Sequence, residues 1–180
     1  MSYCSVVKKL ESNDPNIEYH DKVYGFPIES DNELFGRLIL EINQAGLSWT
    51  TILKKSEAFR KAYSDFDVKL VSEYKEKDIQ RLLNDAGIIR NRLKINAAIH
   101  NANLILELIN EEGSFKNWLD MHHPLDKDEW VKVFKKRGFK FVGGEIINEF
   151  LLSTSYLKGA HVPECSVYST ILKLKPYWNK

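Results

Sequence analysis

The sequence lacks any long apolar stretch and any marked excess of one charge. No run approaches the roughly 18 apolar residues that a membrane-spanning helix needs. Lys8, Lys9 and Glu11 stand where a signal peptide would require an apolar segment. Lys and Arg number 26 and Asp and Glu 25, for a net charge of +1, so bulk charge indicates neither nucleic acid nor membrane as a partner. We therefore expect a cytoplasmic protein with no membrane partner, whose charged binding surfaces arise from local clustering.

Cysteine is scarce, because the chain has only Cys4 and Cys165, almost at opposite ends of the sequence. A structural disulfide is not expected in a reducing compartment. Two interpretations stay open: a pair of buried thiols, or a metal site that joins the two ends of the chain.

The chain also lacks internal repeats, low-complexity tracts and any linker rich in Pro, Gly or Ser. Hydrophobic residues make up 43% of the 180 residues and aromatic residues 12%, which is enough for a substantial core. Disorder is thereby excluded for most of the chain, and we expect a single domain over residues 1–180.

Residues typical of helix starts and ends recur along the sequence. Ser30 and Glu33 have capping-box spacing, and apolar residues then recur with helical period until Gly46. Similar signals predict a helix after Ser48, short helices after Asp67 and over 78–86, a long helix over about 91–109, and further helices over 114–118, 126–138 and 146–152. Convincing alternating runs are absent, which favours an all-α fold over an α/β fold.

Four residues with soft ligand atoms form the strongest chemical signal: Cys4, His20, His161 and Cys165. His161 and Cys165 are four residues apart, close enough for a turn to fold both around one ion. Two nitrogens and two thiolates suit tetrahedral zinc and leave no open position for water, so such a site would be structural. It would tie an irregular N-terminal segment to an irregular C-terminal one. Two unrelated buried cysteines and two surface histidines would give the same spacing, so the pattern alone leaves both interpretations open.

Two stretches without acidic residues could contact phosphate. The first, over 86–106, holds three basic residues and a short glycine turn before a helix N-terminus, whose unpaired amides favour an anion. The second, over 130–141, holds Lys132, Lys135, Lys136, Arg137 and Lys140. An ordinary helix-turn-helix connection and a solvated helix end explain each stretch separately. Two such stretches in a nearly neutral chain shift the balance modestly towards a phosphate backbone.

Glu41 has an unusual place on its predicted helix. At 100° per residue it lies about 20° from Leu34 and beside Leu38, at the border of the apolar stripe. A carboxylate there must be paired, solvated in a cleft, or available to a ligand. Trp49 lies close by in sequence and Tyr19 lies on the N-terminal segment, and packing in the core is the ordinary role of such aromatic residues.

Longer blocks of the sequence resemble the DNA-3-methyladenine glycosylase I family. The order and separations of these blocks agree from Cys4 to Cys165, so the similarity spans nearly the whole chain. The matching blocks are Tyr19-His20-Asp21 followed by Gly25 and Pro27, Gln44-Ala45-Gly46-Leu47-Ser48-Trp49, Ile52-Leu53-Lys54-Lys55, Asp85-Ala86-Gly87-Ile88-Ile89-Arg90, and Lys136-Arg137-Gly138-Phe139-Lys140-Phe141-Val142-Gly143.

The resemblance implies an all-α, helix-hairpin-helix DNA glycosylase fold with a zinc snap that joins residues 1–27 to residues 153–180. It implies one structural zinc ion on Cys4, His20, His161 and Cys165. It places the hairpin at about residues 79–106, where the family grips the phosphate backbone beside the lesion, and the plug that fills the gap in the duplex at Gly46 and Leu47. The expected DNA-binding residues besides the plug are Gly87, Ile88, Arg90, Arg92, Lys136 and Arg137.

For the base, the resemblance implies that Trp49 stacks on the excised purine while Glu41 and Tyr19 contact its edge. Tyr24 is expected beside them, although the family's usual Glu-Trp-Gly is here Val23-Tyr24-Gly25. Two further departures are Val6, where relatives often have tryptophan, and Gly159-Ala160, where relatives have Asn-Asp. The family lacks the general-base aspartate of other helix-hairpin-helix glycosylases, so Glu41 is expected first as a recognition and electrostatic residue and second as the catalytic residue.

The implied activity is the monofunctional release of 3-methyladenine from alkylated double-stranded DNA, leaving an abasic site and the free base. A monomer is expected, and no lysine is placed for Schiff-base chemistry. The alternative from another class is a non-catalytic, zinc-stabilised module that binds bent or damaged DNA; retention of both Glu41 and Trp49 argues against it. A zinc hydrolase is a third interpretation, which four protein ligands disfavour.

Overall fold

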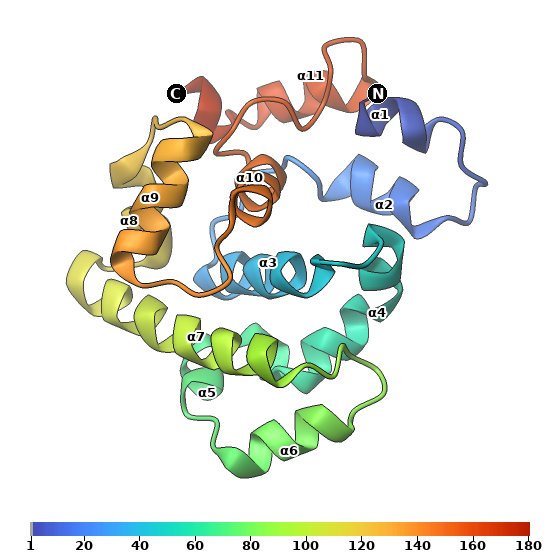
Figure 1. Cartoon of the computed structure of the whole chain (residues 1–180). Helices are drawn as coiled ribbons and strands as arrows, with labels where there is room; N and C mark the ends of the chain where they lie inside the picture. The colour runs from blue at the N-terminus through green and yellow to red at the C-terminus, as the bar shows by residue number, and fades with distance from the viewer. Residues whose placement is uncertain (1) are drawn as a thin grey trace.

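A computed structural model describes residues 2–180, and in this part of the chain it contains helices and no strand (Figure 1). The all-α prediction is thus confirmed. The α-helices are α1 (Tyr3–Val7), α2 (Pro15–Lys22), α3 (Asp31–Gln44), α4 (Trp49–Ala62), α5 (Val68–Ser72), α6 (Glu76–Asn84), α7 (Arg92–Glu112), α8 (Phe115–His122), α9 (Lys127–Arg137), α10 (Gly144–Ser153) and α11 (Ser166–Lys173). Two short 3-10 helices complete the set, η1 (Ser64–Phe66) and η2 (Tyr177–Asn179).

The predicted caps Ser30, Ser48 and Asp126 begin helices where the sequence placed them, whereas α6 starts and ends two residues before the predicted 78–86 helix. The Ser30 hydroxyl accepts a hydrogen bond from the Glu33 amide at the start of α3, and Ser48 does the same for Thr51 in α4. Asp126 opens α9 with a full capping box, and left-handed Gly138 follows its last residue. These local signals are strong because each cap satisfies backbone groups that the helix itself leaves unpaired.

Helix α3 lies at the centre of the molecule, with α4, α7 and α10 packed around it (Figure 1). Its residues Leu34, Phe35, Leu38 and Ile39 are almost completely buried and contribute to one continuous hydrophobic core. Gly36 is required there, since a side chain at this position would collide with the Phe66 ring. A central helix of this kind can carry a polar side chain into the interior only where a cavity or a partner receives it.

The two ends of the chain are more regular than expected. The sequence predicted irregular terminal segments, but α1, α2 and α11 are helical, and α1 lies beside α11 (Figure 1). The prediction was wrong because it overlooked two local caps. Ser2 accepts a hydrogen bond from Ser5, and Asp14 caps α2 with Pro15 at the first helical position.

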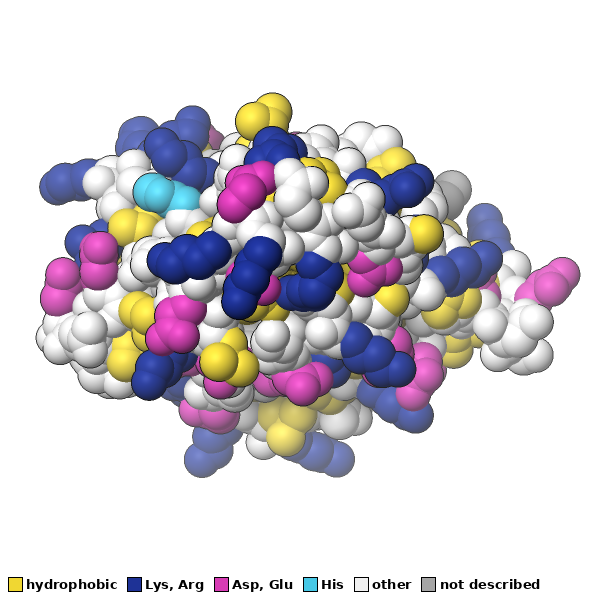
Figure 2. All heavy atoms as spheres, turned by 90° about the horizontal axis from the view of Figure 1, so that it is seen from below, with side chains coloured by type: hydrophobic (Ala, Val, Ile, Leu, Met, Phe, Trp, Pro, Cys, Tyr) yellow, Lys and Arg dark blue, Asp and Glu magenta, His cyan; other side chains and the backbone are white. Residues whose placement is uncertain are grey.

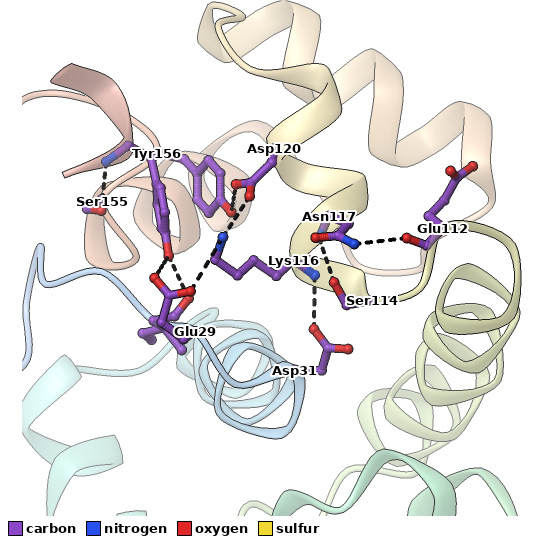
Figure 3. Close-up of polar contacts among 11 residues, drawn as sticks. Glu29, Asp31, Glu112, Ser114, Lys116, Asn117, Asp120, Ser155 and Tyr156 are labelled. Atoms are coloured by element: carbon purple, nitrogen blue, oxygen red, sulfur yellow. Dashed lines mark hydrogen bonds and ion pairs between the residues drawn. The ribbon is translucent and has the colours of Figure 1, made fainter. Parts of the chain in front are cut away.

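Polar contacts fasten α8 to the N-terminal end of α3 and to the C-terminal residues (Figure 3). The Asp31 carboxylate accepts hydrogen bonds from the backbone amides of Phe115 and Lys116. The Lys116 ammonium lies 2.6 Å from Asp120 and 3.5 Å from Glu29, and the Tyr156 hydroxyl donates to Asp120. Every charged group in this cluster has a partner, which marks it as part of the scaffold.

Candidate functional site

A cavity of about 310 Å³ opens where α2, α3 and α10 meet the start of α4. Aromatic rings and two carboxylates dominate its wall, and no Lys, Arg or His belongs to its lining. The lining residues are Ser2, Tyr3, Tyr19, Tyr24, Glu41, Gln44, Trp49, Glu149, Gly159 and Ala160. The volume and the aromatic wall suit a flat organic group.

Glu41 projects from α3 into this cavity and is only 4% exposed. Among residues 2–180, no side chain forms a hydrogen bond or an ion pair with its carboxylate. Burial raises the pKa of Glu41 to about 8, Arg37 on the same helix partly opposes the rise, and Glu149 adds to it. An unpaired carboxyl group in such a place is costly unless a ligand compensates it, so the cavity favours a cationic guest.

Tyr19 brings a hydroxyl to the same wall from the last turn of α2. The guanidinium of Arg37, itself 8% exposed, donates a hydrogen bond to the Tyr19 hydroxyl oxygen at 2.9 Å. Because that oxygen is occupied as an acceptor by Arg37, the proton of Tyr19 remains available for a ligand. Arg37 was not predicted, and no sequence signal distinguished it from a solvated residue of α3.

Rings from three elements form the aromatic wall. The Trp49 and Tyr19 ring centroids are 5.0 Å apart, those of Tyr19 and Tyr24 are 5.7 Å apart, and Tyr3 lies 5.2 Å from Tyr24. The Trp49 indole nitrogen is buried without a hydrogen-bond partner in the described chain. The structure therefore brings Glu41, Tyr19, Tyr24 and Trp49 to one cavity, and Tyr3, which was not predicted, forms another part of the wall.

Glu149 on α10 is another cavity residue that the sequence did not indicate. Its carboxylate accepts a hydrogen bond from the Tyr24 hydroxyl at 3.1 Å and one from the Asn148 amide at 3.3 Å. A single acidic residue on an amphipathic helix carries no sequence signal of its own, since only the packing of α10 turns it towards the cavity.

A second site lies at the contact between the two ends of the chain. Cys4, His20, His161 and Cys165 are all buried, and their ligand atoms lie within 4.8 Å of one another. The Cys165 sulfur is 3.5 Å from Nδ1 of His161 and 3.6 Å from Nε2 of His20, while the Cys4 sulfur is 3.6 Å from Nδ1 of His161. Tetrahedral zinc, with bonds of about 2.0–2.3 Å, separates sulfur and nitrogen ligands by roughly 3.6 Å. These four residues could hold a metal ion.

The second nitrogen of each histidine is also positioned for metal binding. Nδ1 of His20 lies 2.7 Å from the Asp21 carboxylate, and Nε2 of His161 lies 2.8 Å from the Tyr24 carbonyl oxygen. Such outer partners fix the ring orientation and leave the other nitrogen free to bind. Burial lowers the pKa of His161, which favours the neutral imidazole that a metal requires.

The predicted hairpin is the connection between α6 and α7. Gly87 donates its amide to the Asp85 carboxylate, Ile88 is buried, and the Lys55 ammonium binds the carbonyl oxygens of Ala86 and Gly87. The turn is thus held from within by a buried side chain and from outside by α4.

Two arginines that flank this turn differ in their surroundings. Arg90 is exposed and has no acidic partner in the described chain. Arg92 is exposed but forms two hydrogen bonds with Glu76, at 3.0 and 3.2 Å. Of the two, only Arg90 presents an uncompensated charge to a phosphate.

The loop between α3 and α4 carries Gly46, with φ +85°, and Leu47, which is 39% exposed. The buried ammonium of Lys94 on α7 donates to the carbonyl oxygens of Asn43 and Ala45. Lys94 therefore links the start of α7 to the loop beside the cavity, a connection that the sequence did not reveal.

Lys136 and Arg137 lie at the end of α9, away from the hairpin turn. Lys136 is exposed, whereas Arg137 pairs with Glu107 and Glu111 near the end of α7, at 3.3 and 3.0 Å. On the face at the α5 and α6 side of the molecule, basic side chains gather beside a histidine at one end, whereas basic and acidic side chains are interspersed over the rest of the face (Figure 2). The six expected DNA-binding residues besides the plug therefore do not form one cluster. They are Gly87, Ile88, Arg90, Arg92, Lys136 and Arg137. Within residues 2–180, none of the helices is both long and apolar enough to span a membrane.

Comparisons with known proteins agree with this geometry. A family model described as methyladenine glycosylase matches residues 9–129. DNA-3-methyladenine glycosylase 1 of Escherichia coli is 38% identical over 87% of this chain and 94% of its own length, and the Haemophilus influenzae DNA-3-methyladenine glycosylase is 35% identical over 83% and 90%.

Solved structures give the same result. The 3-methyladenine DNA glycosylase I of Staphylococcus aureus has a TM-score of 0.79 at 31% identity and covers 87% of this chain and 93% of that one. A variant 3-methyladenine DNA glycosylase I in complex with 3-methyladenine has a TM-score of 0.80 at 30% identity, covering 93% and 97%. The chain belongs to the methyladenine glycosylase family, as its sequence blocks predicted.

Proposed function

We propose that this protein is a monofunctional DNA glycosylase that hydrolyses the N-glycosidic bond of 3-methyladenine in alkylated double-stranded DNA. The observation that carries the proposal is the unpaired, buried Glu41 carboxyl group in an aromatic cavity. The relatives that bear this activity in their names, at 35–38% identity, support it.

The chemistry of the lesion fits such a cavity. Methylation at N3 gives the purine a positive charge and weakens its bond to the sugar, so the base is already a good leaving group. Trp49 and Tyr19 attract a cation through their ring faces, an interaction worth about 0.5–1 kcal/mol when exposed and about 2 kcal/mol when desolvated. Unmodified adenine is neutral and leaves Glu41 without a counter-charge, so it is bound less well.

In the reaction the bond between N9 of the purine and C1′ of the sugar breaks, and its electron pair neutralises the departing base. A water oxygen bonds to C1′ and loses a proton, which leaves an abasic site. Flipping the nucleotide into the cavity costs a few kcal/mol, and less when the base is damaged. Glu41 contributes by stabilising positive charge in the cavity, and Tyr19 donates a hydrogen bond that Arg37 orients.

The hairpin is proposed to hold the DNA backbone at backbone amides of Gly87 and Ile88, with Arg90 as the main side-chain contact. Leu47, exposed beside Gly46, is proposed to enter the space that the flipped base leaves. Arg92, Lys136 and Arg137 are proposed as weaker contacts, since two of the three are paired with carboxylates. One copy of the chain supplies all of these groups, so the proposed active form is a monomeric single domain.

The metal of the second site is proposed to be a single zinc ion on Cys4, His20, His161 and Cys165. The sulfur–nitrogen separations and the mixed ligand set support this choice. When bound, the ion crosslinks the two ends of the chain; with four protein ligands it has no open position, so it takes no part in hydrolysis.

The test is to incubate the purified protein with methylated double-stranded DNA and to identify the released bases by chromatography. Release of free 3-methyladenine is expected, with no release from unmethylated DNA and strongly reduced release by Glu41→Gln. Binding to an abasic duplex without release of any base would contradict the proposal and favour a non-catalytic DNA-binding module.

A further inference from the structure

Two carboxylates reach the cavity from different helices. Glu41 enters from α3 and is almost completely buried, whereas Glu149 enters from α10 and is half-buried. The charge of Glu149 acts on the other polar groups of the wall: it raises the pKa of Glu41 and that of Tyr24. Its field therefore extends across the cavity.

Two hydrogen bonds hold the Glu149 carboxylate in place at the cavity wall. The Tyr24 hydroxyl donates to one carboxylate oxygen at 3.1 Å, and the Asn148 amide donates to the other at 3.3 Å. Neither donor carries a charge, so the negative charge of Glu149 is positioned by both contacts without being neutralised.

Within the described chain no cation forms an ion pair with Glu149, although the charge of Glu149 reaches Lys127 on α9. Arg37 points its guanidinium at the Tyr19 hydroxyl, on α2, and partly offsets Glu41. Lys127 on α9 forms an ion pair with Glu145, at 2.7 Å, one helical turn before Glu149 and outside the cavity.

We propose that Glu149 is a second specificity-determining residue of this pocket. Its negative charge at the cavity wall favours positively charged methylated purines, in addition to the buried carboxyl group of Glu41. This inference deepens the proposed function and rests on it. A half-buried carboxylate stays partly hydrated, so it provides a standing negative charge at less desolvation cost than a fully buried one. Tyr24 acts as the positioning residue that keeps this charge at the cavity wall.

The test uses two small probes that differ in charge and little in shape. The 3,9-dimethyladeninium ion is permanently cationic and mimics the methylated nucleoside, with a methyl group in place of the sugar. 9-Methyladenine is its neutral counterpart. Calorimetric titration of each probe into the unaltered protein and into Glu149→Gln separates an effect of charge from an effect of cavity shape.

The Glu149→Gln variant is expected to bind the cationic probe about tenfold more weakly, the size of effect of one charge several ångströms away at intermediate dielectric. Its affinity for the neutral probe should change less than twofold. Glu145→Gln is the matched control, because it removes the same charge from the same helix at a side chain that is 86% exposed and paired with Lys127. It should leave both affinities unchanged.

A Tyr24→Phe variant separates the effect of the Glu149 charge from the effect of its position. It keeps the carboxylate but removes one of its donors, so we expect a two- to fourfold loss for the cation and a small change for the neutral probe. Equal losses for both probes in Glu149→Gln would show a structural role and overturn the inference.

Activity separates this inference from the proposed function. If the unaltered protein releases 3-methyladenine while Glu149→Gln matches it in release rate and in cation affinity, the inference fails and the proposed function stands. If the unaltered protein releases no base, the proposed function fails and this inference fails with it.

Discussion

Two polar clusters in this protein use the same kinds of residue in opposite ways. In the cluster around Lys116, the ammonium binds Asp120 and Glu29, and the hydroxyl groups of Tyr156 and Tyr177 donate to the same two carboxylates (Figure 3). In the cavity, Glu41 has neither a hydrogen bond nor an ion pair within the described chain, although it is only 4% exposed.

The difference lies in how the charge is compensated. Lys116 is a fixed counter-ion supplied by the fold, so its cluster stabilises the contact between α3 and α8. Glu41 lacks such a counter-ion, and burial raises its pKa to about 8. A carboxyl group that the fold leaves uncompensated costs stability and is retained where a ligand supplies the missing charge.

Removing the acid from the uncompensated site should have the largest effect on activity. Glu41→Gln is expected to lower the rate of 3-methyladenine release by about 10²–10³-fold, the range found for loss of one preorganised electrostatic contact. Affinity for an abasic duplex, measured by fluorescence anisotropy, should stay within about twofold. Loss of both together would show that Glu41 supports the fold.

The same variant should change the pH dependence of stability. Because the pKa of Glu41 is raised in the folded state from 4.5 to about 8, the folded protein retains a proton that the unfolded chain releases. Stability should therefore fall as pH rises from about 4.5 to 8 and then level off. Glu41→Gln should remove that decline, by several kcal/mol at pH 9, in urea unfolding at a series of pH values. A decline of the same size in the variant would contradict the raised pKa.

Removing one of the four metal ligands tests whether a bound ion stabilises the contact between the two ends of the chain. Cys165→Ser should lower the zinc content well below one ion per chain and lower Tm by about 10 °C, corresponding to roughly 3–5 kcal/mol. Ser166→Ala, at the exposed neighbouring position, is the control and should change neither value. A Cys165→Ser protein of full stability would rule out the crosslink between the chain ends.

Breaking the compensated cluster should affect stability alone. Lys116→Met leaves Asp120 and Glu29 without their cation and should cost about 2 kcal/mol, which lowers Tm by roughly 4–8 °C. Release of 3-methyladenine at 20 °C should remain within twofold. Lys22→Met, which breaks the exposed pair with Glu18, is expected to cost less than about 0.5 kcal/mol. If Lys116→Met and Lys22→Met lowered the free energy of unfolding equally, the Lys116 cluster would contribute no more to stability than an exposed ion pair.

The smallest effect is expected at the hairpin. Arg90→Ala should weaken binding to all DNA sequences by about three- to fivefold and reduce the slope of log affinity against log salt by about 1. Arg92→Ala should do less, because its charge is already compensated by Glu76. A stronger effect at Arg92 than at Arg90 would reverse this assignment.

The features that local chemistry determines could be predicted from the sequence. Helices α3, α4 and α9 begin at the predicted caps, because a Ser or Asp side chain satisfies amides only a few residues away. The metal-ligand set could be proposed because cysteine is rare in this chain. Glu41 stood out since a carboxylate beside an apolar stripe is exceptional.

Other features depend on contacts between distant segments and could not be predicted from the sequence. Glu149 and Arg37 look like ordinary acidic and basic residues of amphipathic helices until α10 packs against α3 and Tyr19 of α2 contacts Arg37. Lys94 likewise becomes a buried donor to the end of α3 only in the folded chain. Helices α1 and α2 were missed for a different reason: their caps, Ser2 and Asp14, precede segments with little apolar periodicity. Helix α11 was missed because its N-cap residue, Cys165, provides no side-chain cap.

The state of the Glu41 carboxyl group can be measured directly by ¹³C NMR, following glutamate side-chain carboxyl signals with pH and assigning Glu41 by its loss in Glu41→Gln. We expect this signal to titrate near pH 8 in the free protein and at a clearly lower pH with the 3,9-dimethyladeninium ion bound. Titration near pH 4.5 that the cation does not alter would show that Glu41 is neither desolvated nor in contact with the base.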